Sequence, residues 1–117
     1  MADQYRKLHP KLAGAVAFVF GEPGDPDVAA VLRDNPTDAS IAAIVQQGYL
    51  VRTFPDPTLA EGLAALASGA HVVSTDYPVE RKWAPGYVLT LPGGGPSRCN
   101  PVAALPGCTT AAVNAEQ

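Results

Sequence analysis

The sequence has few of the residues on which whole classes of function depend. Lysine and arginine together number eight, against eleven aspartates and glutamates, which gives a formal net charge of −3. Because no basic field exists to collect phosphates, a nucleic-acid partner is not expected. The only two histidines, His9 and His71, lie far apart in the sequence. Acid–base cleavage of a phosphodiester needs one group to accept a proton and another to donate one, and this chain offers no convincing pair.

Long hydrophobic runs are also absent. The longest, Leu12–Phe20, has nine residues, about half of what a transmembrane helix requires. Three basic residues precede it, as they would in a signal peptide, but Asp3 lies near them and no small-residue cleavage pattern follows. A buried strand explains this run better than a signal peptide does, and no transmembrane segment is expected.

Cysteine occurs only at Cys99 and Cys108, in a stretch rich in proline and glycine. Neither a CxxC motif nor a cluster of histidine and cysteine is present, so the sequence predicts no metal site and argues against catalytic thiol chemistry. The short separation suits a disulfide, which would place the parent protein outside the cytoplasm. The alternative is two free thiols in a reducing cytoplasm.

Glycine and proline, by contrast, are abundant, with eleven and twelve residues. They gather at 21–36 and 78–107, which makes those two stretches irregular. The remaining segments alternate between strand and helix periodicity. We expect strands over 13–20, 49–54 and 71–75, helices over 27–33, 39–47 and 57–67, a turn over 22–26 and one more extended segment over 87–91.

Two of the expected helices carry boundary signals. Thr37 or Asp38 can cap the first, and Gly48 is placed to terminate it. Asp56 is expected to cap the second, with Pro57 in its first turn, where a missing amide hydrogen costs little. The apolar stripe and the terminating glycine of this second helix are expected at Leu59, Leu63, Leu66, Ala67 and Gly69.

Strands and helices that alternate with tight connections are the signature of parallel βαβ units. The sequence therefore predicts an α/β fold over residues 1–91. An irregular tail rich in glycine and proline follows over 92–117 and contains the expected disulfide. In sheets of this kind functional groups gather at the carboxyl ends of the strands, which here fall at 20–22, 52–54 and 74–77.

Arg52 lies near one of these strand ends among apolar neighbours, where a charged group needs a partner or a ligand. An ion pair with Asp56 or Asp76 would provide a partner. Alternatively, the guanidinium fork suits a phosphate. Asp76 and Tyr77, at the end of the next strand, can hold sugar or inositol hydroxyls, and a turn cap before Pro78 is the competing interpretation.

Two other groupings are weaker candidates. Ser74, His71 and Asp76 have the residue types of a nucleophilic triad, but alternation along a strand puts His71 on the opposite face from the other two. The loop 93–98 has the glycines of a phosphate-binding loop without its strand, its lysine or its helix. We expect a flexible loop there, in which Arg98 could at most present a fixed cation to an anion.

Two stretches carry a family resemblance: residues 48–56 read GYLVRTFPD, and residues 65–78 read ALASGAHVVSTDYP. With Tyr87, RCNPV at 98–102 and Cys108, they resemble the end of bacterial phosphatidylinositol-specific phospholipase C-like proteins of the calcium-dependent branch. That family belongs to the PLC-like phosphodiesterases, which share a TIM barrel. Phe54-Pro55 stands where the family usually has Arg-Ala, and His71 stands where glutamine is usual.

The resemblance implies cleavage of a phosphodiester in a phosphoinositide or similar lipid. A histidine pair would act as base and acid, and Ca²⁺ would stabilise the phosphoryl oxygens. It also implies a secreted or extracytoplasmic parent protein. The family's catalytic histidines and metal-binding carboxylates lie on the early strands of the barrel. We therefore expect this chain to hold only the last three to four strands, to be inactive alone, and to show no cofactor site of its own.

Three or four parallel strands cannot close an eight-stranded barrel, so two sheet edges and an apolar face would be exposed. Such edges favour self-association. The alternative function is therefore non-enzymatic: a small α/β module that dimerises or packs on a partner.

Overall fold

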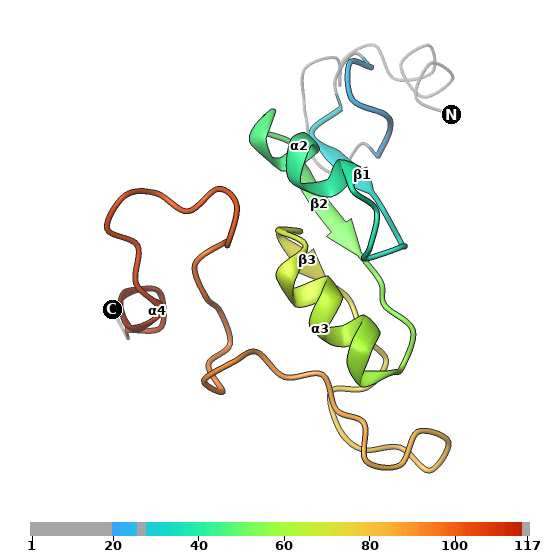
Figure 1. Cartoon of the computed structure of the whole chain (residues 1–117). Helices are drawn as coiled ribbons and strands as arrows, with labels where there is room; N and C mark the ends of the chain where they lie inside the picture. Colours follow the sequence, from blue (N-terminus) through green and yellow to red (C-terminus); the bar gives the residue numbers. More distant parts are fainter. Residues whose placement is uncertain (1–19, 26–27, 116–117) are drawn as a thin grey trace, which may run out of the picture.

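The computed structural model describes residues 20–25 and 28–115, and its centre is a three-stranded parallel sheet in the order β1-β2-β3. The strands are β1 (Ala30–Leu32), β2 (Leu50–Thr53) and β3 (Val72–Val73). Helices α2 (Ser40–Gln46) and α3 (Leu59–Ala67) connect them, and α4 (Thr110–Val113) lies in the tail (Figure 1). The predicted parallel βαβ organisation is thereby confirmed.

The core lies between the sheet and α2. Val31 of β1 and Val51 of β2 are paired in register and are both completely buried. They pack against Ile41, Ile44 and Val45, which recur at helical spacing on one face of α2. Side chains alternate across a strand, so the neighbours of these valines point to the other face of the sheet.

Helix α2 forms close to where the sequence predicts it, but it begins at Ser40 and its N-cap is Ala39, which makes no side-chain cap bond. Neither Thr37 nor Asp38 is therefore the N-cap, although the Asp38 carboxylate accepts from the Ser40 amide at 2.8 Å. At the other end, Gly48 has φ +90° and its amide donates to the Val45 carbonyl, while the next amide reaches back to Ile44. This pair of bonds is a Schellman motif, which terminates helices at a glycine.

The expected start of α3 is wrong by two residues. Thr58, not Asp56, is the N-cap, and its hydroxyl accepts from the Glu61 amide at 3.2 Å. Thr58 and Glu61 have the spacing of a capping box, which favours this start. Pro57 lies before the helix, because the Asp56 carbonyl instead accepts from the Thr58 amide in a tight turn.

The expected apolar stripe of α3 is also mostly wrong. Only Leu66 of that stripe is buried, whereas Leu59 and Leu63 are 70% and 54% exposed. The helix instead buries Gly62, Ala65 and Leu66. Gly62 sets this orientation, because Tyr87 packs so closely that a Cβ on Gly62 would lie 2.9 Å from its hydroxyl.

The predicted helix over 27–33 is wrong, because residues 30–32 form strand β1. The Leu50 amide donates to the Ala29 carbonyl and the Arg33 amide to the Arg52 carbonyl, both at 2.9 Å. Pairing with β2 thus overrides the helix propensity of this alanine-rich segment. The predicted strand 13–20 lies outside the described residues except for Phe20, which forms a parallel bridge with Ala30. The predicted turn is confirmed where it is described, since the Asp25 amide donates to the Glu22 carbonyl.

The remaining predictions concern β3 and the tail. β3 is shorter than 71–75, although the amides of His71 and Ser74 extend its bonding to β2 on both sides. Residues 87–91 form no strand, and the Leu89 amide donates to the Tyr77 carbonyl at 3.2 Å. The Cys99–Cys108 disulfide is confirmed. Within the described ranges, no helix is long and apolar enough to cross a membrane.

Candidate functional site

The two faces of the sheet differ. Helices α2 and α3 lie on the same side of it (Figure 1). The other side carries Leu50, Phe54 and Val72, which are 42%, 38% and 42% exposed. Among residues 20–25 and 28–115 no helix covers this second face, which we call the open face, whereas parallel sheets are normally covered on both faces.

Arg52 lies on the open face, near the carboxyl end of β2, and is half-buried. Its Nε donates to the Ser74 hydroxyl at 2.7 Å, and its guanidinium carbon lies 5.8 Å from the centre of the Phe54 ring. The parallel register places Arg52 opposite Val72, two residues before Ser74, which explains this contact. Among the described residues, no ion pair joins Arg52 to Asp56 or Asp76, so that interpretation of Arg52 is wrong.

Arg33 directly follows Leu32, the register partner of Arg52 in β1, and its side chain is bound differently. Its guanidinium donates to both carboxylate oxygens of Glu22, at 2.6 and 3.2 Å, and lies 3.5 Å from Asp38. The hydrogen bonding of Arg33 to the Glu22 carboxylate is the main cause that raises the pKa of the Arg33 guanidinium. Carboxylates therefore neutralise Arg33, whereas Arg52 is held by a neutral hydroxyl and an aromatic ring.

Asp76 and Tyr77 follow β3 but do not bond to Arg52. Asp76 is exposed. The turn is capped by Thr75 instead, whose hydroxyl accepts from the Tyr77 amide at 3.0 Å. The Tyr77 ring packs edge-to-face on Tyr87, with ring centres 5.4 Å apart. Asp76 and Tyr77 therefore lie after β3, the strand next to that of Arg52. Among the described residues, neither of them forms a hydrogen bond or ion pair with Arg52.

Tyr87 is a residue whose role the sequence patterns missed. It is 8% exposed, and its hydroxyl has no hydrogen-bond partner among the described residues. Burial, and to a lesser extent Tyr77, raises the pKa of this phenol. The signal that could have found it is Gly62, because a glycine inside a helix often marks the close approach of another group.

A cleft of about 470 Å³ runs along the outer edge of β3, between that strand and the tail. The tail forms hydrogen bonds there that the sequence did not predict. Arg98 donates to the Leu66 carbonyl at the end of α3, and the Asn100 amide donates to the Gly69 carbonyl at 2.7 Å. Arg98 thus provides a hydrogen-bond donor for a carbonyl in the last turn of α3. This structural role differs from the expected one, a cation presented by a flexible loop.

The rejected triad residues have separate partners. Ser74 accepts from Arg52, whereas the His71 Nδ1 atom accepts from the Val51 amide at 3.3 Å. No group of three or more histidine, cysteine, aspartate or glutamate side chains that could hold a metal ion occurs within residues 20–25 and 28–115. The described residues therefore do not fit a Ca²⁺ site.

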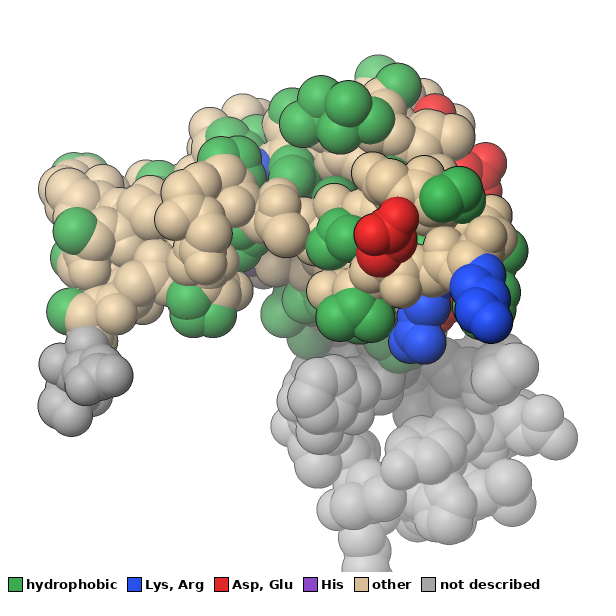
Figure 2. All heavy atoms as spheres, turned by 90° about the horizontal axis from the view of Figure 1, so that it is seen from below, with side chains coloured by type: hydrophobic (Ala, Val, Ile, Leu, Met, Phe, Trp, Pro, Cys, Tyr) green, Lys and Arg blue, Asp and Glu red, His purple; other side chains and the backbone are tan. Residues whose placement is uncertain are grey.

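The surface charge is mixed. Acidic, basic and hydrophobic side chains are interspersed on the face that Figure 2 shows, and neither sign dominates it. The candidate site is defined by one arginine, Arg52, which Ser74 and Phe54 orient.

A parallel βαβ sheet with a cation at a strand's carboxyl end defines a small α/β protein with a candidate anion site. A family model described as phosphoinositide phospholipase C, Ca²⁺-dependent, matches residues 1–101, and the chain belongs to this family. No curated protein and no solved structure matches it.

Proposed function

We propose that this chain is the C-terminal part of a phospholipase C-like phosphodiesterase, in which Arg52 binds the phosphate of the substrate. The observation that carries the proposal is the geometry of Arg52. It lies near the carboxyl end of β2 on the uncovered face, oriented by Ser74. Family membership supplies the substrate class, a phosphoinositide or a similar phosphodiester.

Arg52 suits an anion better than Arg33 does. A guanidinium has five N–H donors in a planar fork, which matches a phosphate. Glu22 already takes up two donors of Arg33 and neutralises its charge. The Nε atom of Arg52 donates to Ser74, and its Nη atoms have no hydrogen-bond partner among the described residues. The ring of Phe54 supports the flat cation from the side.

In this proposal Asp76 and Tyr77 contact the hydroxyls of the substrate's polyol. Asp76 is exposed, so its carboxylate can accept from hydroxyls without breaking a structural bond. Tyr77 is held by Tyr87 through an edge-to-face contact, which limits the entropy it loses on binding.

We further propose that the chain alone does not turn over a phosphodiester. The sequence has two histidines, and His71 uses its Nδ1 atom to accept from the Val51 amide. The described residues thus contribute binding groups without an acid–base pair. In a completed barrel the remaining strands would pair at the edges of β1 and β3, and the open face with Leu50 and Val72 would turn toward the interior.

The test is a titration of the purified chain with inositol 1-phosphate, followed in the wild type and in each variant by the backbone amide NMR signals of residues 74–77, which adjoin Arg52. Binding by the wild type should weaken about tenfold or more in Arg52→Gln, because a charge-assisted hydrogen bond is lost. The matched control is Arg81→Gln, which removes an equally charged side chain from the exposed loop after β3. Equal affinity of the two variants would refute the role of Arg52. Turnover of a phosphoinositide by the wild-type chain above a heat-inactivated control would refute the proposed inactivity.

A second candidate is a non-enzymatic module that self-associates through the open face. The exposure of Leu50, Phe54 and Val72 favours it, because apolar side chains on an uncovered sheet attract a partner. Sedimentation equilibrium distinguishes the candidates. Self-association that Val72→Thr weakens, in a chain that does not bind inositol 1-phosphate, would support the module, whereas a monomer would exclude it.

A further inference from the structure

The first part of the tail forms a clamp on the turn between α3 and β3. This clamp consists of residues 98–102. Arg98 donates to the Leu66 carbonyl, and the Asn100 side chain donates to the Gly69 carbonyl. Val102 then packs on Gly69, where any Cβ would collide with it, and against the core beneath. The clamp thus closes the C-terminal end of α3 with three consecutive contacts.

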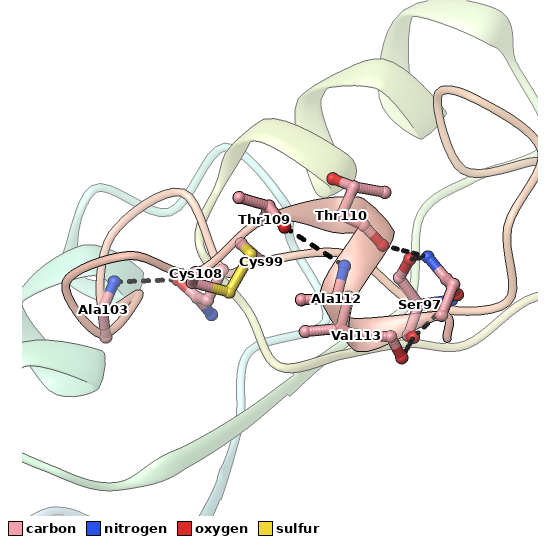
Figure 3. Close-up of a disulfide and its surroundings, with 10 residues drawn as sticks. Ser97, Cys99, Ala103, Cys108, Thr109, Thr110, Ala112 and Val113 are labelled. Atoms are coloured by element: carbon pink, nitrogen blue, oxygen red, sulfur yellow. Dashed lines mark hydrogen bonds between the residues drawn. A yellow bond between two sulfur atoms is a disulfide. The ribbon is translucent and has the colours of Figure 1, made fainter. Parts of the chain in front are cut away.

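The disulfide lies inside this clamp. Cys99 stands between the two residues that donate to the turn, and Cys108 reaches it from just before α4, with 6.0 Å between the Cα atoms (Figure 3). The side-chain oxygen of Asn100, Oδ1, accepts from the backbone amides of Val102 and Ala103, and these two bonds fix the shape of the clamp. The disulfide therefore joins the clamp to α4 at the point where the clamp makes its contacts.

Little else holds the far part of the tail. Helix α4 has only four residues and buries none of them. Asn114 bonds to Ser97 in both directions, with distances of 3.2 and 2.7 Å, and this is a contact within the tail itself. In both views the end of the tail stands apart from the sheet (Figures 1 and 2). Two connections therefore join α4 to the segment at the clamp: the disulfide, and the hydrogen bonds between Asn114 and Ser97.

The clamp also forms one wall of the cleft beside β3. Arg98, Asn100 and Pro101 line it from the tail, opposite His71 and Val72 of the strand. Because β3 is the last strand of the sheet, its outer edge borders this cleft. A movement of the clamp away from the turn would uncover that edge, and unprotected strand edges recruit other chains.

We infer that the Cys99–Cys108 disulfide is a redox latch, which keeps the clamp on the α3–β3 turn and the edge of β3 covered while it is oxidised. A dithiol reductant opens it in two steps. A thiolate of the reductant attacks one sulfur, the S–S bond breaks, and a mixed disulfide forms. The second thiol of the reductant then displaces the chain's cysteine. The chain gains two thiols, and the reductant becomes a disulfide.

Access to the bond is consistent with this chemistry. Both cysteines are half-buried, and residues 103–107 between them are exposed. Reduction removes the covalent constraint between the clamp and the segment before α4. The part-buried hydrogen bonds of Arg98 and Asn100 and the packing of Val102 are then left to hold the clamp. The inference does not rest on the proposed phosphodiesterase role, because none of these residues belongs to the Arg52 site.

The experiment compares the oxidised and the reduced chain by NMR, with reduction verified by mass. In the oxidised chain we expect a nuclear Overhauser effect between a Val102 methyl group and the Gly69 α-protons. It should disappear after reduction, while the effect between Ile41 and Val51 in the core is retained. Hydrogen exchange over residues 70–75 should rise about tenfold, because the strand edge loses its cover. Reoxidation should restore both signals.

The double variant Cys99→Ser/Cys108→Ser is the matched control, and it should resemble the reduced chain with or without reductant. Persistence of the Val102–Gly69 effect in the reduced chain would show that the disulfide closes only its own loop. Loss of the Ile41–Val51 effect as well would show that it stabilises the whole fold. Either result would overturn the latch.

Discussion

The sheet region, residues 28–75, and the tail, residues 92–115, are held together by different interactions. In the sheet region, completely buried Val31, Ile41 and Val51 form a contiguous apolar core. In the tail, order comes from a disulfide, from asparagine side chains and from caps, and α4 buries nothing. Apolar burial stabilises a region without specifying each contact, whereas polar clamps depend on a few individual groups.

This difference determines how far the effect of a substitution should spread in each region. A substitution in the core should affect the whole sheet, because the buried side chains touch one another. A substitution in the tail should act locally, because few of its contacts reach the core, and Val102 is the main exception.

Truncation of the core should have the largest effect. Ile41→Ala removes a side chain that is 1% exposed and leaves a cavity against Val31 and Val51. We expect the free energy of unfolding to fall by about 2–5 kcal/mol, measured by urea denaturation followed by circular dichroism. Leu59→Ala is the matched control, since that leucine is 70% exposed and should change little. Similar losses in both variants would mean that α2 does not form the core.

Removal of the disulfide should separate the two regions. Closing a loop of this length is worth about 2–3 kcal/mol in the chain-entropy model. In Cys99→Ser/Cys108→Ser we expect this loss in the tail, with less than about 1 kcal/mol in the unfolding of the sheet region. Circular dichroism of the sheet and exchange of the tail amides, measured on the same sample, distinguish the two. If the free energy of unfolding of the sheet region fell by the full amount of about 2–3 kcal/mol, the sheet region and the tail would not be stabilised separately.

The fold could be predicted from the sequence where local signals and tertiary contacts agree. Helix α2 is an example, because its apolar spacing and Gly48 both point to the structure that forms. Strand β1 was mistaken for a helix, because its alanine-rich segment becomes a strand only by pairing with Leu50 and its neighbours. The orientation of α3 was missed because Tyr87, which sets it, lies 25 positions after Gly62.

The candidate site was predictable to a similar degree. The position of Arg52 near a strand's carboxyl end follows from the periodicity. Its partner does not, because the bond to Ser74 depends on the register between β2 and β3. The clamp of Arg98 on Leu66 spans 32 positions and involves a backbone carbonyl, which leaves no trace in residue type.

The two threonine caps allow a direct comparison of the regions. Thr58 caps α3 and Thr109 caps α4, each by accepting from an amide three residues later, at 3.2 and 3.1 Å. Thr58→Ala should lower the free energy of unfolding by about 1 kcal/mol, because α3 is part of the cooperative fold. Thr109→Ala should leave the unfolding of the sheet region unchanged and only increase exchange in α4. Equal effects on global unfolding would show that the tail folds together with the sheet.

The smallest expected effect is a dependence on pH at the start of α2. The hydrogen bond from the Ser40 amide, supported by the Ser40 side chain and by Arg33, lowers the pKa of Asp38 below its ordinary value of 3.8. A carboxyl whose pKa is lower in the folded state contributes stability above its unfolded pKa and loses that contribution as the pH falls through the folded value. The midpoint temperature of thermal unfolding, measured from pH 6 down to pH 2, should therefore decline less steeply in Asp38→Asn than in the wild type.

Asp56→Asn is the matched control, because the Asp56 side chain caps nothing among the described residues. Since Asp38 is on the sheet region's surface, the difference should be modest, and identical slopes for wild type and Asp38→Asn would show that the Asp38 bond contributes nothing to folding.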